Sequence, residues 1–308
     1  MTATRCKEGV TLGSVDQNTT SNASAPAARS QIRAVWRRLL RNRMAVIGGC
    51  VVLFFVAVAV FAPLTAPYDP NKPDFMARLQ GPSAKHWLGS DTLGRDMLSR
   101  IMYGSRYSLL AGIVSVTIAA VVGTLLGLLS GYYGGWVDMV IMRLMDMLLA
   151  FPGILLAIAI ISVLGRGLFN AMVSVGLYSV PSFARVVRSR VLSLREQEFV
   201  ESARAIGDTD ARILFLHILP NIMTPVIIMS TMRLGTTILA AASLSFLGLG
   251  AQPPMPEWGA ILSGGRDVLR VAPHIAAFPG LAILMTVVGF NLLGDGVRDA
   301  LDPKLKDK

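Results

Sequence analysis

The strongest constraint in this sequence is a series of apolar runs, several of which reach or exceed the roughly 18–20 residues that an α-helix needs to cross a bilayer. Of the 308 residues, 53% are hydrophobic and only 16% are charged, whereas soluble domains usually carry about 25% charged residues. The apolar runs account for that shortfall. The sequence therefore predicts an all-α, polytopic membrane protein.

The apolar runs predict about six transmembrane helices. Their approximate ranges are 44–62, 107–131, 137–163, 168–187, 222–249 and 275–293. Proline removes a backbone hydrogen bond, so Pro63 is expected to end the first helix and Pro152 to kink the third. Gly123, Gly127 and Gly131 are spaced by four residues, which predicts a flat helix face that another helix approaches closely.

The distribution of arginine predicts the orientation in the membrane. The net charge is +10, but arginines cluster beside apolar runs, which favours membrane lipid rather than nucleic acid as the partner. A basic cluster precedes the first helix, so the N-terminus is expected in the cytoplasm. Six crossings then place both termini and the segment 188–220 in the cytoplasm. Segment 64–106 is expected outside, although it holds six Lys and Arg residues, because the first helix usually dominates.

The predicted organisation follows from these assignments. Residues 1–32 are expected to form a disordered cytoplasmic tail, because they are rich in Ser, Thr, Asn and Ala. Residues 33–104 hold the first transmembrane helix and the extracytoplasmic segment. The main transmembrane domain covers 105–297 with its loop 188–220, and a cytoplasmic tail covers 298–308.

The sequence contains no motif for catalysis, a cofactor or a metal. The three histidines are far apart and the two cysteines lack metal-type spacing. There is no Gly-Lys dipeptide, so a phosphate-binding loop is excluded, and neither His-Glu-x-x-His nor Gly-x-Ser-x-Gly occurs. We expect a chain that is not an enzyme and does not hydrolyse ATP itself.

Segment 188–220 is a charged helix–turn–helix between two apolar runs. Residues 198–206 predict a helix with one apolar stripe formed by Phe199, Ala203 and Ile206. Gly207 is expected to end this helix and one of residues 208–210 to cap the next, which runs to Pro220. Periodicity alone favours a membrane-surface helix and a docking site for a soluble partner equally.

One motif in this segment resembles a known family. Glu201-Ser-Ala-Arg-Ala-Ile-Gly207, followed by Leu219-Pro220, is similar to the EAA loop of ABC importer permeases. Ser202 and His217 depart from the usual alanine and isoleucine. Runs 88–96, 243–254 and 291–303 resemble the C-type permease subunit of dipeptide and oligopeptide importers, and 151–157 and 272–274 also resemble the glutathione type. The resemblance covers roughly residues 36–304.

The resemblance implies a type I ABC importer permease fold in the bacterial cytoplasmic membrane. It implies four kinds of partner: a homologous second permease, two cytoplasmic ATPase subunits, an extracytoplasmic solute-binding protein and a peptide solute. The solute stays open between a dipeptide, a longer peptide, glutathione and a nickel complex. The residues implied in ATPase coupling are Glu201, Ser202, Ala203, Gly207, His217, Leu219 and Pro220.

Two other function classes fit the sequence less well. A secondary transporter or channel would need internal repeats or paired broken helices, and no clear repeat is present. A membrane-embedded enzyme would need a nucleophile or metal constellation. Both would also leave the charged loop without a role.

Three charged residues lie inside the predicted transmembrane helices and need partners or water. Arg143 and Asp146 are three residues apart on one helix face, which predicts a structural ion pair or snorkelling. Arg233 has no acidic residue nearby in its own helix. We expect it to face the permease interior, to pair across helices or to meet the carboxylate of a passing peptide.

Overall fold

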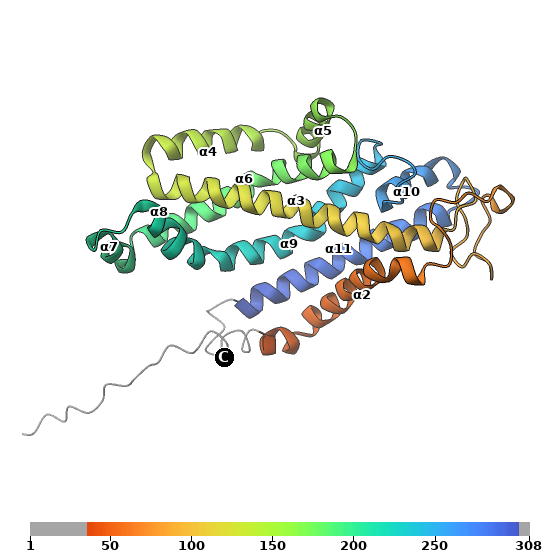
Figure 1. The fold of residues 1–308 in the computed structure, drawn as a ribbon, viewed down its shortest axis with the longest axis horizontal. Helices are drawn as coiled ribbons and strands as arrows, with labels where there is room; N and C mark the ends of the chain where they lie inside the picture. Colours follow the sequence, from red (N-terminus) through yellow and green to blue (C-terminus); the bar gives the residue numbers. More distant parts are fainter. Residues whose placement is uncertain (1–35, 302–308) are drawn as a thin grey trace, which may run out of the picture.

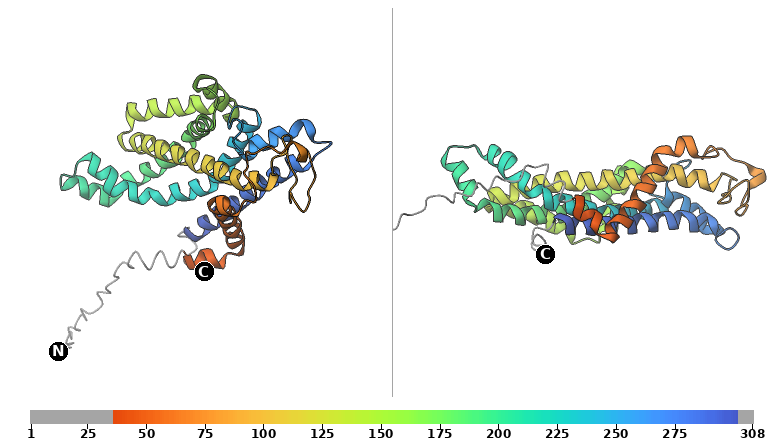
Figure 2. Two further views of the ribbon diagram at one scale, coloured as in Figure 1. Left: turned by 45° about the vertical axis from the view of Figure 1, so that its right-hand side comes forward. Right: turned by 90° about the horizontal axis from the view of Figure 1, so that it is seen from below.

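The computed structural model describes residues 36–301, and all regular elements within that range are helices. The predicted tail 1–32 and residues 302–308 of the predicted C-terminal tail lie outside the described residues. The longer helices run lengthwise through an elongated molecule (Figures 1 and 2). Helices α7 and α8 project at one end, which we call the coupling end, while α10 and the irregular segment 66–96 lie at the other.

The helices follow one another in a simple order. They are α2 (Arg43–Thr65), α3 (Met97–Tyr133), α4 (Gly135–Leu149), α5 (Gly153–Leu164), α6 (Leu168–Arg195), α7 (Glu198–Ala205), α8 (Asp210–Arg212), η2 (Ile213–Ile218), α9 (Leu219–Phe246), α10 (Trp258–Gly265) and α11 (His274–Leu301), with short 3₁₀ turns η1 (Phe75–Ala77) and η3 (Arg266–Val268). α3 packs along α6 and also contacts α2, α4 and α9, while α9 and α2 flank α11. α3 is therefore the central helix of the bundle.

The predicted third transmembrane helix is wrong in detail. α4 and α5 meet at an angle of 97° instead of forming one kinked helix. Pro152 precedes α5, and it lacks the N–H that a continuous helix would need there. α5 has 12 residues and is about 18 Å long, too short to cross a bilayer alone.

The predicted end of the first helix at Pro63 is wrong, and two other helices also extend beyond their predicted bounds. α2 continues through Pro63 to Thr65. α6 passes Pro181 and extends to Arg195, eight residues into the predicted loop 188–220. α3 begins at Met97 and so includes the last part of the predicted segment 64–106. Tertiary packing along the neighbouring helices compensates for the lost backbone hydrogen bonds.

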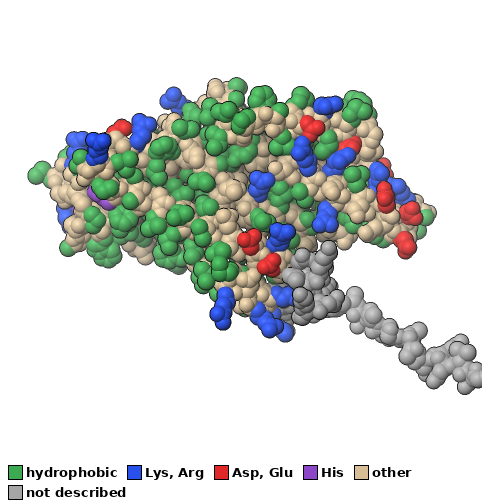
Figure 3. Space-filling model, turned by 180° about the vertical axis from the view of Figure 1, so that it is seen from behind, with side chains coloured by type: hydrophobic (Ala, Val, Ile, Leu, Met, Phe, Trp, Pro, Cys, Tyr) green, Lys and Arg blue, Asp and Glu red, His purple; other side chains and the backbone are tan. Residues whose placement is uncertain are grey.

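The helices are apolar enough for a membrane protein. Within the described residues, four helices are long and apolar enough to cross a membrane, or five if the bent α4–α5 pair counts as one. α6 is 28 residues long but less apolar, because it is an interior helix with buried Ser and Gly positions. The six predicted apolar segments correspond to α2, α3, the α4–α5 pair, α6, α9 and α11. In Figure 3, hydrophobic side chains cover much of the molecule's middle, while most charged side chains gather toward its two ends.

The predicted small-residue face of α3 is confirmed. A Cβ atom at Gly123 would lie 2.5 Å from Phe183 Cβ, and one at Gly127 would lie 2.6 Å from the Ala184 carbonyl oxygen. One at Gly131 would lie 2.7 Å from Val191 Cβ. The three glycines therefore allow α3 and α6 to approach more closely than any larger side chain permits.

A matched pair of glycines on α2 provides a first prediction. A Cβ atom at Gly48 would lie 2.7 Å from the Gly289 carbonyl oxygen on α11, whereas one at Gly49 would meet only the Leu293 side chain at 3.8 Å. We expect Gly48→Ala to destabilise the protein by about 1–3 kcal/mol through overpacking. Gly49→Ala should be neutral or slightly stabilising because alanine favours the helix. Thermal unfolding in detergent checks this, and equal midpoints for the two variants would contradict it.

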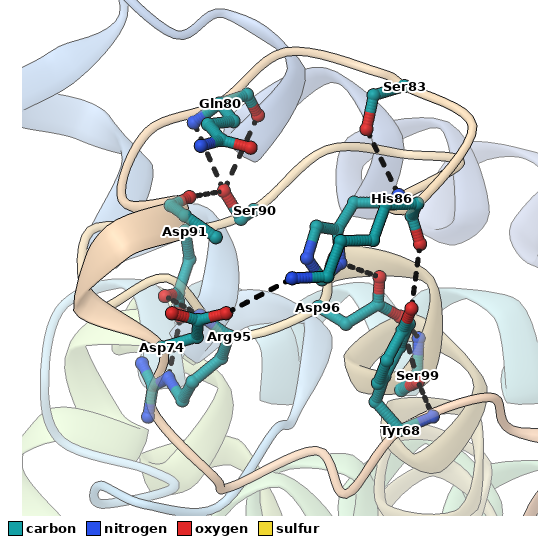
Figure 4. Close-up of polar contacts among 12 residues, drawn as sticks. Tyr68, Asp74, Gln80, Ser83, His86, Ser90, Asp91, Arg95, Asp96 and Ser99 are labelled. Atoms are coloured by element: carbon teal, nitrogen blue, oxygen red, sulfur yellow. Dashed lines mark hydrogen bonds and ion pairs between the residues drawn. The ribbon is translucent and has the colours of Figure 1, made fainter.

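The segment that connects α2 to α3 is held by a buried polar network (Figure 4). His86 Nδ1 lies 2.9 Å from Asp96 Oδ1, and both side chains are buried. Asp96 also caps α3, because its Oδ2 accepts hydrogen bonds from the backbone N–H and the hydroxyl of Ser99 at 2.8 and 2.7 Å. Asp91 accepts a hydrogen bond from Arg95 Nε at 2.7 Å. These contacts fix the segment on the end of α3 without a helix or strand of its own.

Candidate coupling site

We call residues 198–220 the coupling loop, and its first half, α7, ends in a well-formed helix stop. Gly207 has a φ of +88°, a conformation that glycine adopts without strain. Its N–H donates to the Arg204 carbonyl, and the N–H of Asp208 donates to the Ala203 carbonyl, both at 3.0 Å. This is the Schellman arrangement, which satisfies carbonyl groups at a helix end. The predicted helix stop at Gly207 is confirmed.

The residues of the predicted apolar stripe on α7 divide between the core and the surface. The buried side chains are Val200 and Ala203, which pack into a core formed with α3, α6, η2 and α9. Phe199 and Ile206 instead face outward, and Ile206 is 81% exposed. The short helix turns its Val200–Ala203 side inward, so two large apolar residues remain uncovered at the tip of the loop.

The second half of the loop enters the bundle without a break. Thr209 caps α8 by accepting a hydrogen bond from the Arg212 N–H at 3.4 Å. η2 is a π-helical turn that leads directly into α9. The prediction that the helix before Pro220 ends at this residue is therefore wrong. The wider turn before Pro220 accommodates a residue with no N–H to donate.

His217 has a structural partner within the loop. Its Nε2 lies 3.1 Å from Asp208 Oδ2, and Arg212 Nε lies 3.4 Å from Asp208 Oδ1. Asp208 follows the Gly207 turn directly, so both contacts tie this turn to the entry of α9. The departure from the family motif at His217 thus contributes a contact that an isoleucine could not make.

Tyr132, at the end of α3, braces the loop and was missed by the sequence analysis. Its hydroxyl donates to Asp210 Oδ1 at 2.6 Å, and the Arg204 guanidinium lies 5.3 Å from its ring centroid. Arg195 Nη1 donates to the Tyr132 carbonyl at 3.1 Å. The residue lies 78 positions before Asp210, and no local pattern indicates a contact at such a distance.

Removing the Tyr132 hydroxyl should loosen the loop. Tyr132→Phe loses a hydrogen bond to a carboxylate, a contact worth about 1.5–3 kcal/mol. We expect faster amide hydrogen exchange in residues 198–212 and less solute uptake by the assembled transporter. Tyr133→Phe is the matched control, because Tyr133 is half exposed and its hydroxyl makes no hydrogen bond with the described residues. Identical exchange in both variants would contradict a bracing role.

The structure distributes the predicted coupling residues over the two halves of the loop. Glu201, Ser202 and Gly207 are exposed on the α7 side, where Ala203 is buried. On the α9 side, Pro220 is exposed, and His217 and Leu219 are half buried. α7 and α8 lie at one end of the molecule (Figures 1 and 2), so Glu201 and Ser202 of α7 lie at this end.

The charged residues within the transmembrane helices do not pair as their spacing suggests. Asp146 accepts a hydrogen bond from Arg185 Nη2 on α6 at 2.6 Å instead of pairing with Arg143. Asp138 accepts two hydrogen bonds from Arg188, both at 2.5 Å. These cross-helix pairs join α4 to α6. Arg143 is exposed, and Arg233 lies at the midpoint of α9, half buried.

The described residues form a helical bundle with a broken helix and a braced, projecting loop, and the comparisons with known proteins show which class of membrane protein this is. The family model described as "Binding-protein-dependent transport system inner membrane component" matches residues 123–307. A second model, "N-terminal TM domain of oligopeptide transport permease C", matches residues 30–82. The chain belongs to the family of binding-protein-dependent transport permeases, which are multi-pass inner-membrane proteins.

Known proteins support the same assignment. The chain is 54% identical to a glutathione transport system permease protein GsiD from Pectobacterium atrosepticum, over 91% of this chain and 93% of the relative. It is 50% identical to a dipeptide transport system permease protein DppC from Alkalihalophilus pseudofirmus, over 93% and 96%. These matches confirm the prediction that the chain is an ABC transport permease and not an enzyme.

A solved structure supports the fold. The chain resembles one from the inward-facing MetNI methionine ABC transporter with a TM-score of 0.54 and 21% identity, over 66% of this chain and 97% of that chain. This likeness confirms the predicted type I importer permease fold. ATPase and membrane partners are general to ABC importer permeases.

Proposed function

We propose that the chain is the C-type permease subunit of an ATP-driven importer of small peptides or glutathione. It would form half of the translocation pathway beside a homologous second permease. Two ATPase subunits would bind in the cytoplasm, and a solute-binding protein would deliver the solute from outside. Both termini and the coupling loop would then be cytoplasmic.

The observation that carries this proposal is the exposed apolar surface of the coupling loop. Ile206, Phe215 and Leu216 are 81%, 55% and 58% exposed at the coupling end. Exposed apolar groups rimmed by charged residues are typical of protein interaction sites. The loop also carries the Glu201–Gly207 motif, and its backbone is held by Tyr132 and the Gly207 turn. A rigid, partly apolar tip of this kind suits a cleft on a soluble ATPase.

Charge substitution at the loop tip tests the docking step. Ile206→Asp should prevent the ATPase subunits from co-purifying with the detergent-extracted permease. Val271→Asp is the matched control, because Val271 is 75% exposed in the loop at the opposite end of the molecule. Co-purification that survives Ile206→Asp, or that never occurs with the unaltered chain, would contradict the proposal.

The solute is tested separately. The names of the relatives point to glutathione or a dipeptide. Cells that lack this chain should lose uptake of one of the two labelled solutes, and a plasmid copy should restore it. Unchanged uptake of both solutes would exclude the proposed solute class while leaving ATPase docking intact.

A further inference from the structure

Three arginines from three different helices line one cavity toward the coupling end. The cavity has a volume of about 590 Å³. Arg190 comes from α6, Arg233 from α9 and Arg298 from α11. Within residues 36–301, none of these guanidinium groups lies within 4.0 Å of a carboxylate or donates a hydrogen bond. Arg233 is half buried, and a charge inside a membrane protein normally pairs or meets water. Together with the exposed Arg190 and Arg298, which are likewise unpaired within the described residues, it favours an anion as the occupant of this cavity.

The cavity belongs to a face of α9 that runs across the bundle. Pro225, Met229 and Met232 line it, and Leu239 and Ser243 line a second, mostly apolar cavity of about 360 Å³ farther along the same helix. These positions recur every three or four residues, so they lie on one face of α9. A solute that crosses along this face would pass from apolar walls to a basic cavity.

The depth of Arg233 favours a solute over a lipid headgroup. Arg233 lies in the middle of the 28-residue α9 and is half buried, whereas phospholipid headgroups lie at the membrane surface, near the ends of such helices. Guanidinium groups bind carboxylates with two parallel hydrogen bonds. Peptides and glutathione both carry carboxylates.

We propose that this cavity is a carboxylate-binding site that favours solutes of net negative charge during their passage to the cytoplasm. The inference rests on the proposed function and extends it by assigning charge preference to the permease itself. Arg233 would hold the solute carboxylate at mid-depth. Arg190 and Arg298, which are more exposed, would attract it toward the coupling end.

The test compares dipeptides of opposite charge in proteoliposomes that contain the complete importer. Arg233→Gln should lower the rate of Ala-Glu uptake about tenfold, which is the effect of losing one hydrogen bond to a charged group. The rate of Ala-Lys uptake should change less than about twofold, because this dipeptide has no net negative charge. Arg233→Lys should retain most of the preference because it keeps the charge. Arg166→Gln is the control, because Arg166 is exposed in the α5–α6 connection and lies outside the cavity. ATPase activity with the loaded binding protein is measured in parallel.

The outcomes separate this inference from the proposed function. Equal loss of both dipeptides, or no loss of either, would overturn the proposed preference of this cavity for solutes of net negative charge. Failure of the unaltered importer to take up any peptide would overturn the proposed function together with the site. If the importer with Arg233→Gln does not assemble, uptake of the two dipeptides is compared in the double variant Arg190→Gln/Arg298→Gln instead. A selective loss of Ala-Glu uptake in either variant supports the site.

Discussion

Replacing Gly127 with leucine is expected to remove the folded protein from the membrane. The Cβ atom alone would lie 2.6 Å from the Ala184 carbonyl oxygen and 2.7 Å from Val187 Cβ. The first of these atoms belongs to the α6 backbone, so the clash cannot be relieved by a side-chain rotation. Alanine should cost about 1–3 kcal/mol, and leucine considerably more, because α3 and α6 would have to separate. Folded proteins usually have a free energy of unfolding of only about 5–15 kcal/mol, so a loss of this size can prevent folding.

Size-exclusion chromatography of the detergent-extracted protein measures this effect. The unaltered chain should elute as a single peak, Gly127→Ala should give a smaller peak with lower thermal stability, and Gly127→Leu should give aggregate. Val121→Leu is the control on the same helix, because Val121 is 53% exposed and lies on the surface of the described part of the molecule. A normal peak for Gly127→Leu would show that the close contact between α3 and α6 is not required.

Replacing Gly207 with valine is expected to uncouple transport while leaving the bundle folded. A Cβ atom at Gly207 meets nothing within 4 Å, so space is not limiting, but the φ of +88° is one that branched residues avoid. The strain of about 1–2 kcal/mol opposes the turn between α7 and α8. Uptake should fall about tenfold, since about 1.4 kcal/mol corresponds to that factor.

Gly207→Asn is the matched control at the same position. Asparagine has nearly the size of valine but tolerates positive φ values, so it should retain most of the uptake. Both variants should elute normally on size-exclusion chromatography, because Gly207 lies outside the transmembrane bundle. Equal uptake by the valine and asparagine variants would rule out backbone conformation as the reason for glycine here.

Much of the fold could be predicted from local patterns. Apolar runs located the main helices, since a span requires a fixed length of apolar chain. The four-residue glycine spacing predicted the close contact of α3 with another helix, and Gly207 predicted the end of α7. The resemblance to the EAA motif marked the loop for which we propose ATPase docking. Each of these signals is contained within one helix or one turn.

Predictions failed where a distant neighbour decides the outcome. Periodicity placed Phe199, Ala203 and Ile206 on one stripe, but which of them is buried depends on the position of η2 and α9. Pro63 was expected to end the first helix, yet α2 continues through it to Thr65. Asp146 has an arginine three residues away, but its partner comes from α6.

The sequence by itself determined that this chain is a helical membrane protein with a polar helix–turn–helix loop, because hydrophobic length and turn chemistry are local properties. The resemblance of that loop to the EAA motif then pointed to a permease. Only the tertiary structure decided how that loop is held and where free charge accumulates. Tyr132 contacts Asp210 across 78 residues, and the cavity arginines come from three helices. Such sites arise when packing brings separate helices together, and their members share no spacing along the chain.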